Sequence, residues 1–248
     1  MNIRILHFYP DLMNLYGSYA NIPVLRRILE RAGYSITVET VNPGENVPDI
    51  SLNNADFIYM GAGMERRQKM VMEDFTRYAG EIKAAASDGV TMLFAGNALE
   101  LLGSTVTDSA GHTWNGIALA DFSVTQRTRR ITGDVCGHTD LYPETVVGFM
   151  NKSGIVSGIQ TPLLSSLEMG FGNDSERGAE GFHKNNVFAS ELTGPLLVKN
   201  PELLTVLASG ILTRRGESVP ETLTPDEWAV KGYNVTAREL QLRAKALH

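Results

Sequence analysis

The chain of 248 residues is 43% hydrophobic and 20% charged, which is typical of one ordinary globular domain, alone or with an appendage. Its formal net charge of −6 gives no general attraction to phosphate backbones or anionic lipid, so nucleic acid and membranes are not expected as main partners. No apolar run approaches the roughly 18 residues that cross a bilayer, and no signal-peptide pattern is present, so we expect a cytoplasmic protein. The single cysteine, Cys136, excludes an internal disulfide and a thiolate metal cluster.

The first hundred residues alternate apolar strands with amphipathic helices. The expected strands are 3–8, 36–41, 57–60 and 90–94. The expected helices are 22–32 and one long helix through 71–82 that ends near residue 88. This order predicts an α/β fold of three layers, in which a mostly parallel sheet is flanked by helices.

After Gly103 the pattern changes to short strands joined by tight turns. We expect strands at 117–124 and 131–136, a turn at 108–111, and a helix at 201–212. Residues 216–225 have the composition of a linker, and 236–246 predicts an amphipathic helix. The expected organisation is therefore one domain, 1–215, followed by a linker and C-terminal helix, 216–248.

Three loops are expected to meet at the carboxyl ends of the strands, where open α/β sheets bind ligands. They are 61–64, 95–97 and 189–201, the last of which would present Thr193. The loop at 95–97 joins a buried strand sharply to a helix expected from Ala98, as in a nucleophile elbow, yet it contains no Cys, Ser or Thr. The glycines of the loop at 61–64 could point backbone amides into a pocket as an oxyanion hole, or could serve only a tight turn.

Six short motifs follow one another in the order of a known family. They are Asn-Leu-Tyr-Gly-x-x-x-Asn at 14–21, Gly-Ala-Gly-Met-Glu-Arg-Arg-Gln at 61–68, Thr-Gly-Asp at 132–134, Gly-Phe-Met-Asn at 148–151, Gly-Phe-Gly-Asn at 170–173 and Leu-Thr-Gly-Pro-Leu at 192–196. With these motifs the chain resembles the class I glutamine amidotransferases of the cobyric-acid-synthase-like branch, and within it the glutaminase subunits of lipid II isoglutaminyl synthase. The resemblance covers most of residues 1–212 and implies a flavodoxin-like α/β fold.

The resemblance implies hydrolysis of glutamine by a Cys nucleophile and a His base, with backbone amides around the oxyanion and ammonia passed to a partner. The family's Cys falls at Gly96, or at Ala95 if the alignment is moved by one residue, and its His falls at Thr193. The Gly-Gly-Gly start of the family's loop is Gly-Ala-Gly here, with Ala62 at its centre. Because neither catalytic position keeps a reactive atom, we expect no glutamine hydrolysis.

No other residue offers an evident replacement for the nucleophile or the base. Cys136 is expected to be a buried, unreactive thiol, and Ser190 has no neighbouring base in the sequence. The histidines lack the spacing of ligand pairs, so neither a metal nor a cofactor is expected. They are His7, His112, His138, His183 and His248.

The sequence leaves two interpretations of Arg130, one of which is that part of a substrate-binding site is kept. Arg130 matches an arginine that the related glutaminase subunit is thought to use in substrate handling, and it could clamp a carboxylate together with the amides of Gly63 and Met64. The alternative is a solvated basic edge, since Arg127 and Arg129 are its neighbours.

Two functions are therefore compared. In the first, the chain is a non-catalytic subunit of a Mur-ligase-like ATP-dependent partner in peptidoglycan precursor amidation or a related ligation, as the resemblance implies. In the second, the pocket is rebuilt for a small carboxylate ligand. An active glutaminase is a third alternative. A pocket filled by Phe94, Leu99 and Met64 would favour the first, and an open pocket at Arg130 the second.

Overall fold

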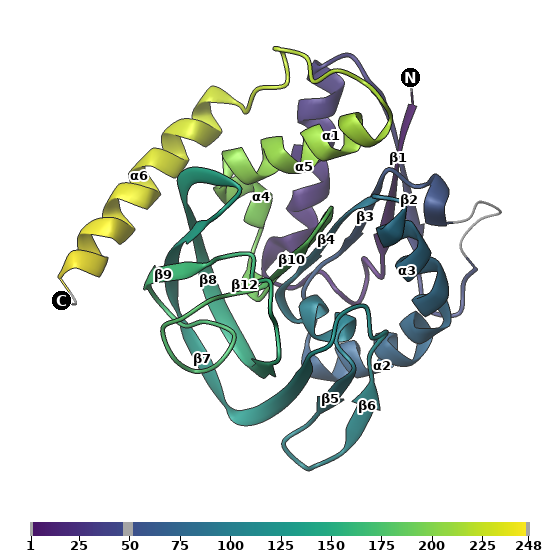
Figure 1. Cartoon of the computed structure of the whole chain (residues 1–248), viewed down its shortest axis with the longest axis vertical. Helices are drawn as coiled ribbons and strands as arrows, with labels where there is room; N and C mark the ends of the chain where they lie inside the picture. The colour runs from purple at the N-terminus through teal and green to yellow at the C-terminus, as the bar shows by residue number, and fades with distance from the viewer. Residues whose placement is uncertain (1, 47–51, 247–248) are drawn as a thin grey trace.

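The computed structural model describes residues 2–46 and 52–246, and its centre is a six-stranded sheet (Figure 1). The strand order is β10-β11-β4-β3-β1-β2, and every neighbouring pair is parallel except β10 with β11. The strands are β1 (Asn2–Phe8), β2 (Ser35–Val41), β3 (Phe57–Met60), β4 (Thr91–Ala95), β10 (Phe182–Lys184) and β11 (Val187–Ser190). The expected strands of the first hundred residues and the mostly parallel sheet are confirmed.

Helices cover both faces of this sheet, as the three-layer prediction requires (Figure 1). One face packs on α1 (Asn21–Arg31) and α5 (Pro201–Arg214), which bury leucines and isoleucines against the alternate residues of β1 and β3. The other face packs on α2 (Glu65–Phe75) and α3 (Ala79–Ser87). The central strands β3 and β4 are buried on both sides, which explains their uninterrupted apolar sequences.

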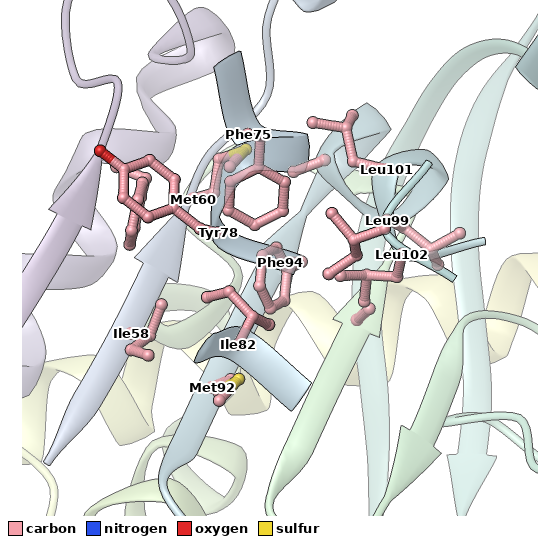
Figure 2. Packing of buried hydrophobic residues seen from close by; sticks show 14 of the residues in the cluster. Ile58, Met60, Phe75, Tyr78, Ile82, Met92, Phe94, Leu99, Leu101 and Leu102 are labelled. Carbon is pink, nitrogen blue, oxygen red and sulfur yellow. The ribbon is translucent and has the colours of Figure 1, made fainter. Parts of the chain in front are cut away.

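The single helix expected through 71–82 is wrong in one respect. The chain forms α2, then the short 3-10 turn η3 (Thr76–Tyr78), then α3. Side chains three residues apart eclipse in a 3-10 turn, and here Phe75 and Tyr78 both reach the ring of Phe8, with centroid distances of 5.5 and 5.4 Å. The apolar spacing indicated the buried face correctly (Figure 2) but did not show that the helix tightens to pack this aromatic group.

A second, largely antiparallel sheet follows, which the sequence did not predict. Its order is β12-β8-β7-β5-β6, and β9 pairs with β7. The strands are β5 (Thr105–Thr107), β6 (Thr113–Asn115), β7 (Ser123–Thr139), β8 (Tyr142–Ser157), β9 (Ser166–Met169) and β12 (Leu192–Thr193). The expected strand 131–136 lies within β7, but the strand expected at 117–124 is wrong, because β7 begins only at Ser123. The expected turn at 108–111 is confirmed and joins β5 to β6. The long β7–β8 hairpin contains register shifts, which the sequence did not indicate.

The C-terminal segment packs on the second sheet. After α4 (Leu196–Lys199) and α5, residues 216–226 contain no helix or strand, and α6 (Glu227–Lys245) begins nine residues before the expected start at 236. The Asp226 side chain caps it by accepting a hydrogen bond from the Trp228 amide (3.0 Å). Its buried face, with Leu240 at the centre, packs against Cys136 and Val147. Among the described residues no helix is both long and apolar enough to span a bilayer.

Candidate functional site

The three loops expected to converge do meet, at the carboxyl ends of β3, β4 and β11. Residues of all three line one small cavity, joined by residues of the N-terminal motif and of the β7–β8 hairpin. The lining residues are Tyr16, Ala62, Gly63, Glu65, Asn97, Glu100, Arg130, Asn151, Lys152, Ser153 and Thr193. The cavity has a volume of only about 10 Å³, which is room for one water at most.

The elbow keeps the backbone shape of a nucleophile turn. Gly96 has φ +62°, in the left-handed region, at the start of the 3-10 helix η4 (Gly96–Leu102). The α-helix expected from Ala98 is therefore wrong, since the chain tightens into a 3-10 helix that buries nearly every residue. A Cβ atom at position 96 would lie 2.6 Å from the Cβ of Ala62, a distance at which one of the two must move. The methyl group of Ala62 occupies the space into which a side chain at the elbow would point.

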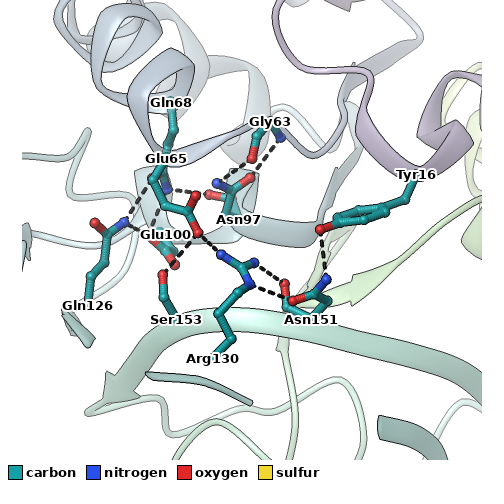
Figure 3. A network of polar contacts seen from close by, with 10 residues as sticks. All are labelled: Tyr16, Gly63, Glu65, Gln68, Asn97, Glu100, Gln126, Arg130, Asn151 and Ser153. Carbon is teal, nitrogen blue, oxygen red and sulfur yellow. Dashed lines mark hydrogen bonds and ion pairs between the residues drawn. The ribbon is translucent and has the colours of Figure 1, made fainter. Parts of the chain in front are cut away.

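The amide of Gly63 is already in use. Its N–H donates to Asn97 Oδ1 (2.9 Å), and its carbonyl accepts from Asn97 Nδ2 (2.9 Å; Figure 3). The predicted oxyanion amide thus has a side-chain partner supplied by the elbow itself. Met64 begins α2 as its N-cap, and its side chain is exposed and does not fill the cavity. Phe94 and Leu99 lie in the apolar core beneath, so the expected filling of the pocket by these three side chains is not what closes it.

Arg130 points into the site but is fully engaged there. Its Nη1 forms an ion pair with Glu65 Oε1, its Nε donates to Asn151 Oδ1 (2.5 Å), and its Nη2 donates to the Asn151 carbonyl (2.6 Å; Figure 3). Asn151 in turn donates to the hydroxyl of Tyr16 (2.8 Å). Partial burial acts to raise the pKa of Glu65, but its own backbone amide and the Arg130 guanidinium hold that pKa below its ordinary value. Arg130 therefore ties the hairpin to α2 and to the N-terminal motif.

Thr193 and Ser190, the hydroxyls of the third loop, are also committed. Thr193 lies in β12, where its Oγ1 donates to the Phe149 carbonyl (2.9 Å). The Ser190 hydroxyl donates to Glu180 Oε2 (2.9 Å). Neither hydroxyl has an imidazole beside it in the part of the chain that the structure describes, so neither forms a nucleophile–base pair.

The histidines and Cys136 lie apart from the site. Burial lowers the pKa of His7 to about 4, which keeps it neutral, and burial raises the pKa of the Cys136 thiol to about 12. His138 pairs with Glu168 on the second sheet (2.6 Å), and His248 lies outside the described residues. Within residues 2–46 and 52–246, no three His, Cys, Asp or Glu side chains are grouped as metal ligands.

A buried polar network beside the cavity was missed from the sequence. Glu100 Oε2 accepts hydrogen bonds from Gln68 Nε2 (2.7 Å) and Gln126 Nε2 (2.7 Å; Figure 3). Glu100 is 1% exposed, and burial raises its pKa. The signal was available in part, because Gln68 belongs to the motif at 61–68 and Glu100 is a lone carboxylate in an apolar run.

Two further buried carboxyls and one lysine extend the network. Glu180 accepts from Ser190 and from the Glu191 amide (2.7 Å), and burial raises its pKa to about 7. Burial, and next the charge of Glu100, raise the pKa of Glu191 well above its ordinary value. Lys152, which is 2% exposed, donates to the carbonyls of residues 172 and 173 (2.6 and 2.9 Å). The charge of Lys152 opposes the rise in the pKa of all three buried carboxyls.

A parallel sheet covered on both faces, an elbow at its carboxyl edge and an appended antiparallel hairpin define a chain with the class I glutamine amidotransferase fold. A crystal structure of a glutamine amidotransferase from Thermotoga maritima has the same fold, with a TM-score of 0.51, 12% identity, and coverage of 96% of this chain and 95% of that one.

Sequence comparison places the chain more narrowly. Residues 4–201 match the CobB/CobQ-like glutamine amidotransferase domain, and the chain belongs to that family. It is 29% identical over 214 residues to the lipid II isoglutaminyl synthase (glutamine-hydrolyzing) subunit GatD of Staphylococcus aureus (strain N315), and the match covers 86% of this chain and 86% of that one. It is 30% identical over 217 residues to the GatD subunit of Streptococcus pneumoniae (strain ATCC BAA-255 / R6), with 86% of this chain and 82% of that one covered.

Proposed function

We propose that this chain is a non-catalytic amidotransferase-fold subunit that acts with a Mur-ligase-like ATP-dependent partner in the amidation of peptidoglycan precursors or a related ligation. The similarity to subunits of lipid II isoglutaminyl synthase supports the pathway, and their description as subunits supports the partnership. In this proposal the chain keeps the fold for assembly and does not release ammonia from glutamine.

The observation that carries the proposal is the contact between positions 62 and 96. The family resemblance places a glycine at 62 and the nucleophilic Cys at 96, whereas this chain has the methyl group at 62 and the glycine at 96. A side chain at 96 would clash with that methyl group at 2.6 Å. The two exchanges fit each other, which supports the proposal that this chain has no nucleophile at the elbow.

The remaining groups of the site support the same function. Thr193, at the position of the base, cannot relay a proton at neutral pH, and its hydroxyl is bonded to a backbone carbonyl. The Gly63 amide is bonded to Asn97 instead of facing an empty pocket. Without nucleophile and base, the residual rate that oxyanion donors alone supply in related chemistry is many orders of magnitude lower.

The second candidate, a carboxylate-binding pocket at Arg130, has less support. The guanidinium already meets Glu65 and Asn151, and the cavity beside it holds about 10 Å³. A ligand held between Arg130 and the Gly63 amide, inside this cavity, would have to displace both partners of Arg130.

The test measures glutamate release from glutamine by the purified chain, alone and with its ligase partner, and ligase turnover with glutamine or with ammonium. We expect no glutamate above background in either case and ligase turnover with ammonium only. Glutamate release that scales with protein concentration and persists through independent purifications would contradict the proposal.

A designed gain of function sharpens the test. The triple variant Ala62→Gly/Gly96→Cys/Thr193→His restores the family residues and the space around them, and Gly96→Cys alone is its matched control. We expect the triple variant, and neither the control nor the wild type, to be labelled at position 96 by an electrophilic glutamine analogue. Labelling of the wild type at any residue of the site would show a nucleophile that the proposal excludes.

A further inference from the structure

Beside the closed cavity, β7 leaves the regular register of its hairpin and presents a run of basic side chains. Gln126 pairs with Gly154 of β8 and Ile131 pairs with Lys152, so residues 127–130 of β7 lie opposite Ser153 alone. Bulges of this kind re-aim side chains and often stand next to functional sites. The bulged residues 127–130 are exposed, and of the three arginines among them only Arg130 lines the closed cavity.

The three arginines of the bulge differ in their partners. Arg130 is held by Glu65 and Asn151. Arg127 and Arg129 form no hydrogen bond or ion pair with any residue that the structure describes, although guanidinium groups in folded proteins commonly pair with carboxylates. Two guanidinium charges are therefore uncompensated in a chain whose formal net charge is −6.

A hollow with a volume of about 380 Å³ lies against these side chains. Its lining combines the three arginines of the bulge with two hydroxyl side chains and an apolar wall, and it contains no acidic residue. The lining residues are Arg127, Arg129, Arg130, Ile131, Thr132, Phe171 and Ser175. The volume is within the range of small-molecule binding sites.

A neighbouring hollow of about 290 Å³ shares Arg127 and Arg130 with the first. Its carboxylates are already neutralised: Asp108 binds Lys69 (2.7 Å), and Glu65 binds Arg130. The hydrogen bond from Lys69 holds the pKa of Asp108 well below its usual range, so this carboxylate stays paired as an anion. No acid of the neighbouring hollow is left to balance Arg127.

We propose that the hollow lined by Arg127 and Arg129 binds a small molecule that carries phosphate groups. Two unpaired planar guanidinium groups match a phosphate dianion, whose oxygens accept paired N–H donors. The hydroxyls of Thr132 and Ser175 add donors, and Phe171 gives an apolar face for a ring or chain attached to the phosphate. The hollow shares only Arg130 with the closed cavity, and the proposal does not depend on the proposed function.

The test is isothermal titration of the purified full chain with pyrophosphate and with ADP, at constant ionic strength because screening changes all charge contacts. Adenosine tests the ring without phosphate, and citrate tests carboxylates. We expect saturable binding of pyrophosphate and ADP, weaker or no binding of adenosine and citrate, and a loss of affinity on the order of tenfold or more in Arg127→Gln/Arg129→Gln. Arg66→Gln, an exposed arginine of α2, is the matched control and should leave both affinities unchanged.

A further variant separates the two parts of the site. Phe171→Ala should weaken ADP more than pyrophosphate, because only the nucleotide carries a ring. The absence of saturable binding of both phosphate compounds would overturn the proposal. So would equal binding of citrate, or an equal loss in Arg66→Gln, since either result would mean general attraction of anions. Thermal unfolding of each variant shows that the loss is not due to misfolding.

Discussion

The two sides of η4 are equally buried but are stabilised in opposite ways. On one side Leu99 and Leu102 enter the apolar core around Phe94 and Phe75 (Figure 2). On the other side Glu100 enters the polar network between η4, α2 and the hairpin (Figure 3). The apolar side tolerates no empty space, whereas the polar side depends on every donor finding an acceptor. The comparison teaches that the space beside the elbow, at the carboxyl ends of the strands, is filled by a polar core.

The largest effect is expected at the buried lysine of the polar side, Lys152. Lys152→Met should destabilise the fold by about 3–5 kcal/mol, because the carbonyls of residues 172 and 173 are left buried without their charged donor. Urea unfolding at neutral pH measures it, with the exposed Lys83→Met as control. A loss below about 1 kcal/mol would mean that the two carbonyls find other donors and that the two sides of η4 differ less than their residues indicate.

The next effect is the pH dependence of the free energy of unfolding that Glu180 causes. Burial raises the folded-state pKa of Glu180 to about 7, while in the unfolded chain it titrates near its ordinary 4.5. Between these values the folded state holds a proton that the unfolded state has lost, so the free energy of unfolding falls as the pH rises through this window. Glu180→Gln should remove this part of the slope, up to about 3 kcal/mol in total.

Urea unfolding at several pH values from 4 to 8 checks the slope, and the exposed Glu239→Gln is the control. An unchanged slope in Glu180→Gln would show that Glu180 is ionised in the fold, and that the protons of the polar side reside on Glu100 and Glu191 alone.

The smallest effect tests the packing at the elbow. Gly96→Cys should cost about 2 kcal/mol, because its Cβ meets Ala62 at 2.6 Å and its backbone has a positive φ. Ala62→Gly together with Gly96→Cys should recover part of that loss, which a double-mutant cycle in urea measures as a coupling energy. Strict additivity would show that the two positions do not share the space between the loops.

Most of the main sheet was predictable because its signal is local. The strands Phe57–Met60 and Thr91–Ala95 are continuous apolar segments between turn residues. A parallel strand that helices cover on both faces buries every side chain, so its sequence is apolar at nearly every position. The antiparallel sheet was not predictable in this way. The buried and exposed residues of β7 alternate irregularly, and its hairpin with β8 changes register at a bulge, 127–130, that no local pattern specifies.

For the site, the sequence by itself determined which atoms are present: a glycine at 96, an alanine at 62, a threonine at 193 and an arginine at 130. The tertiary structure alone decided what these residues meet. It set the Ala62 methyl group into the elbow, bonded Asn97 to the Gly63 amide and turned Arg130 toward Glu65. Composition is encoded residue by residue, but hydrogen-bond partners and free volume depend on distances between segments far apart in the chain.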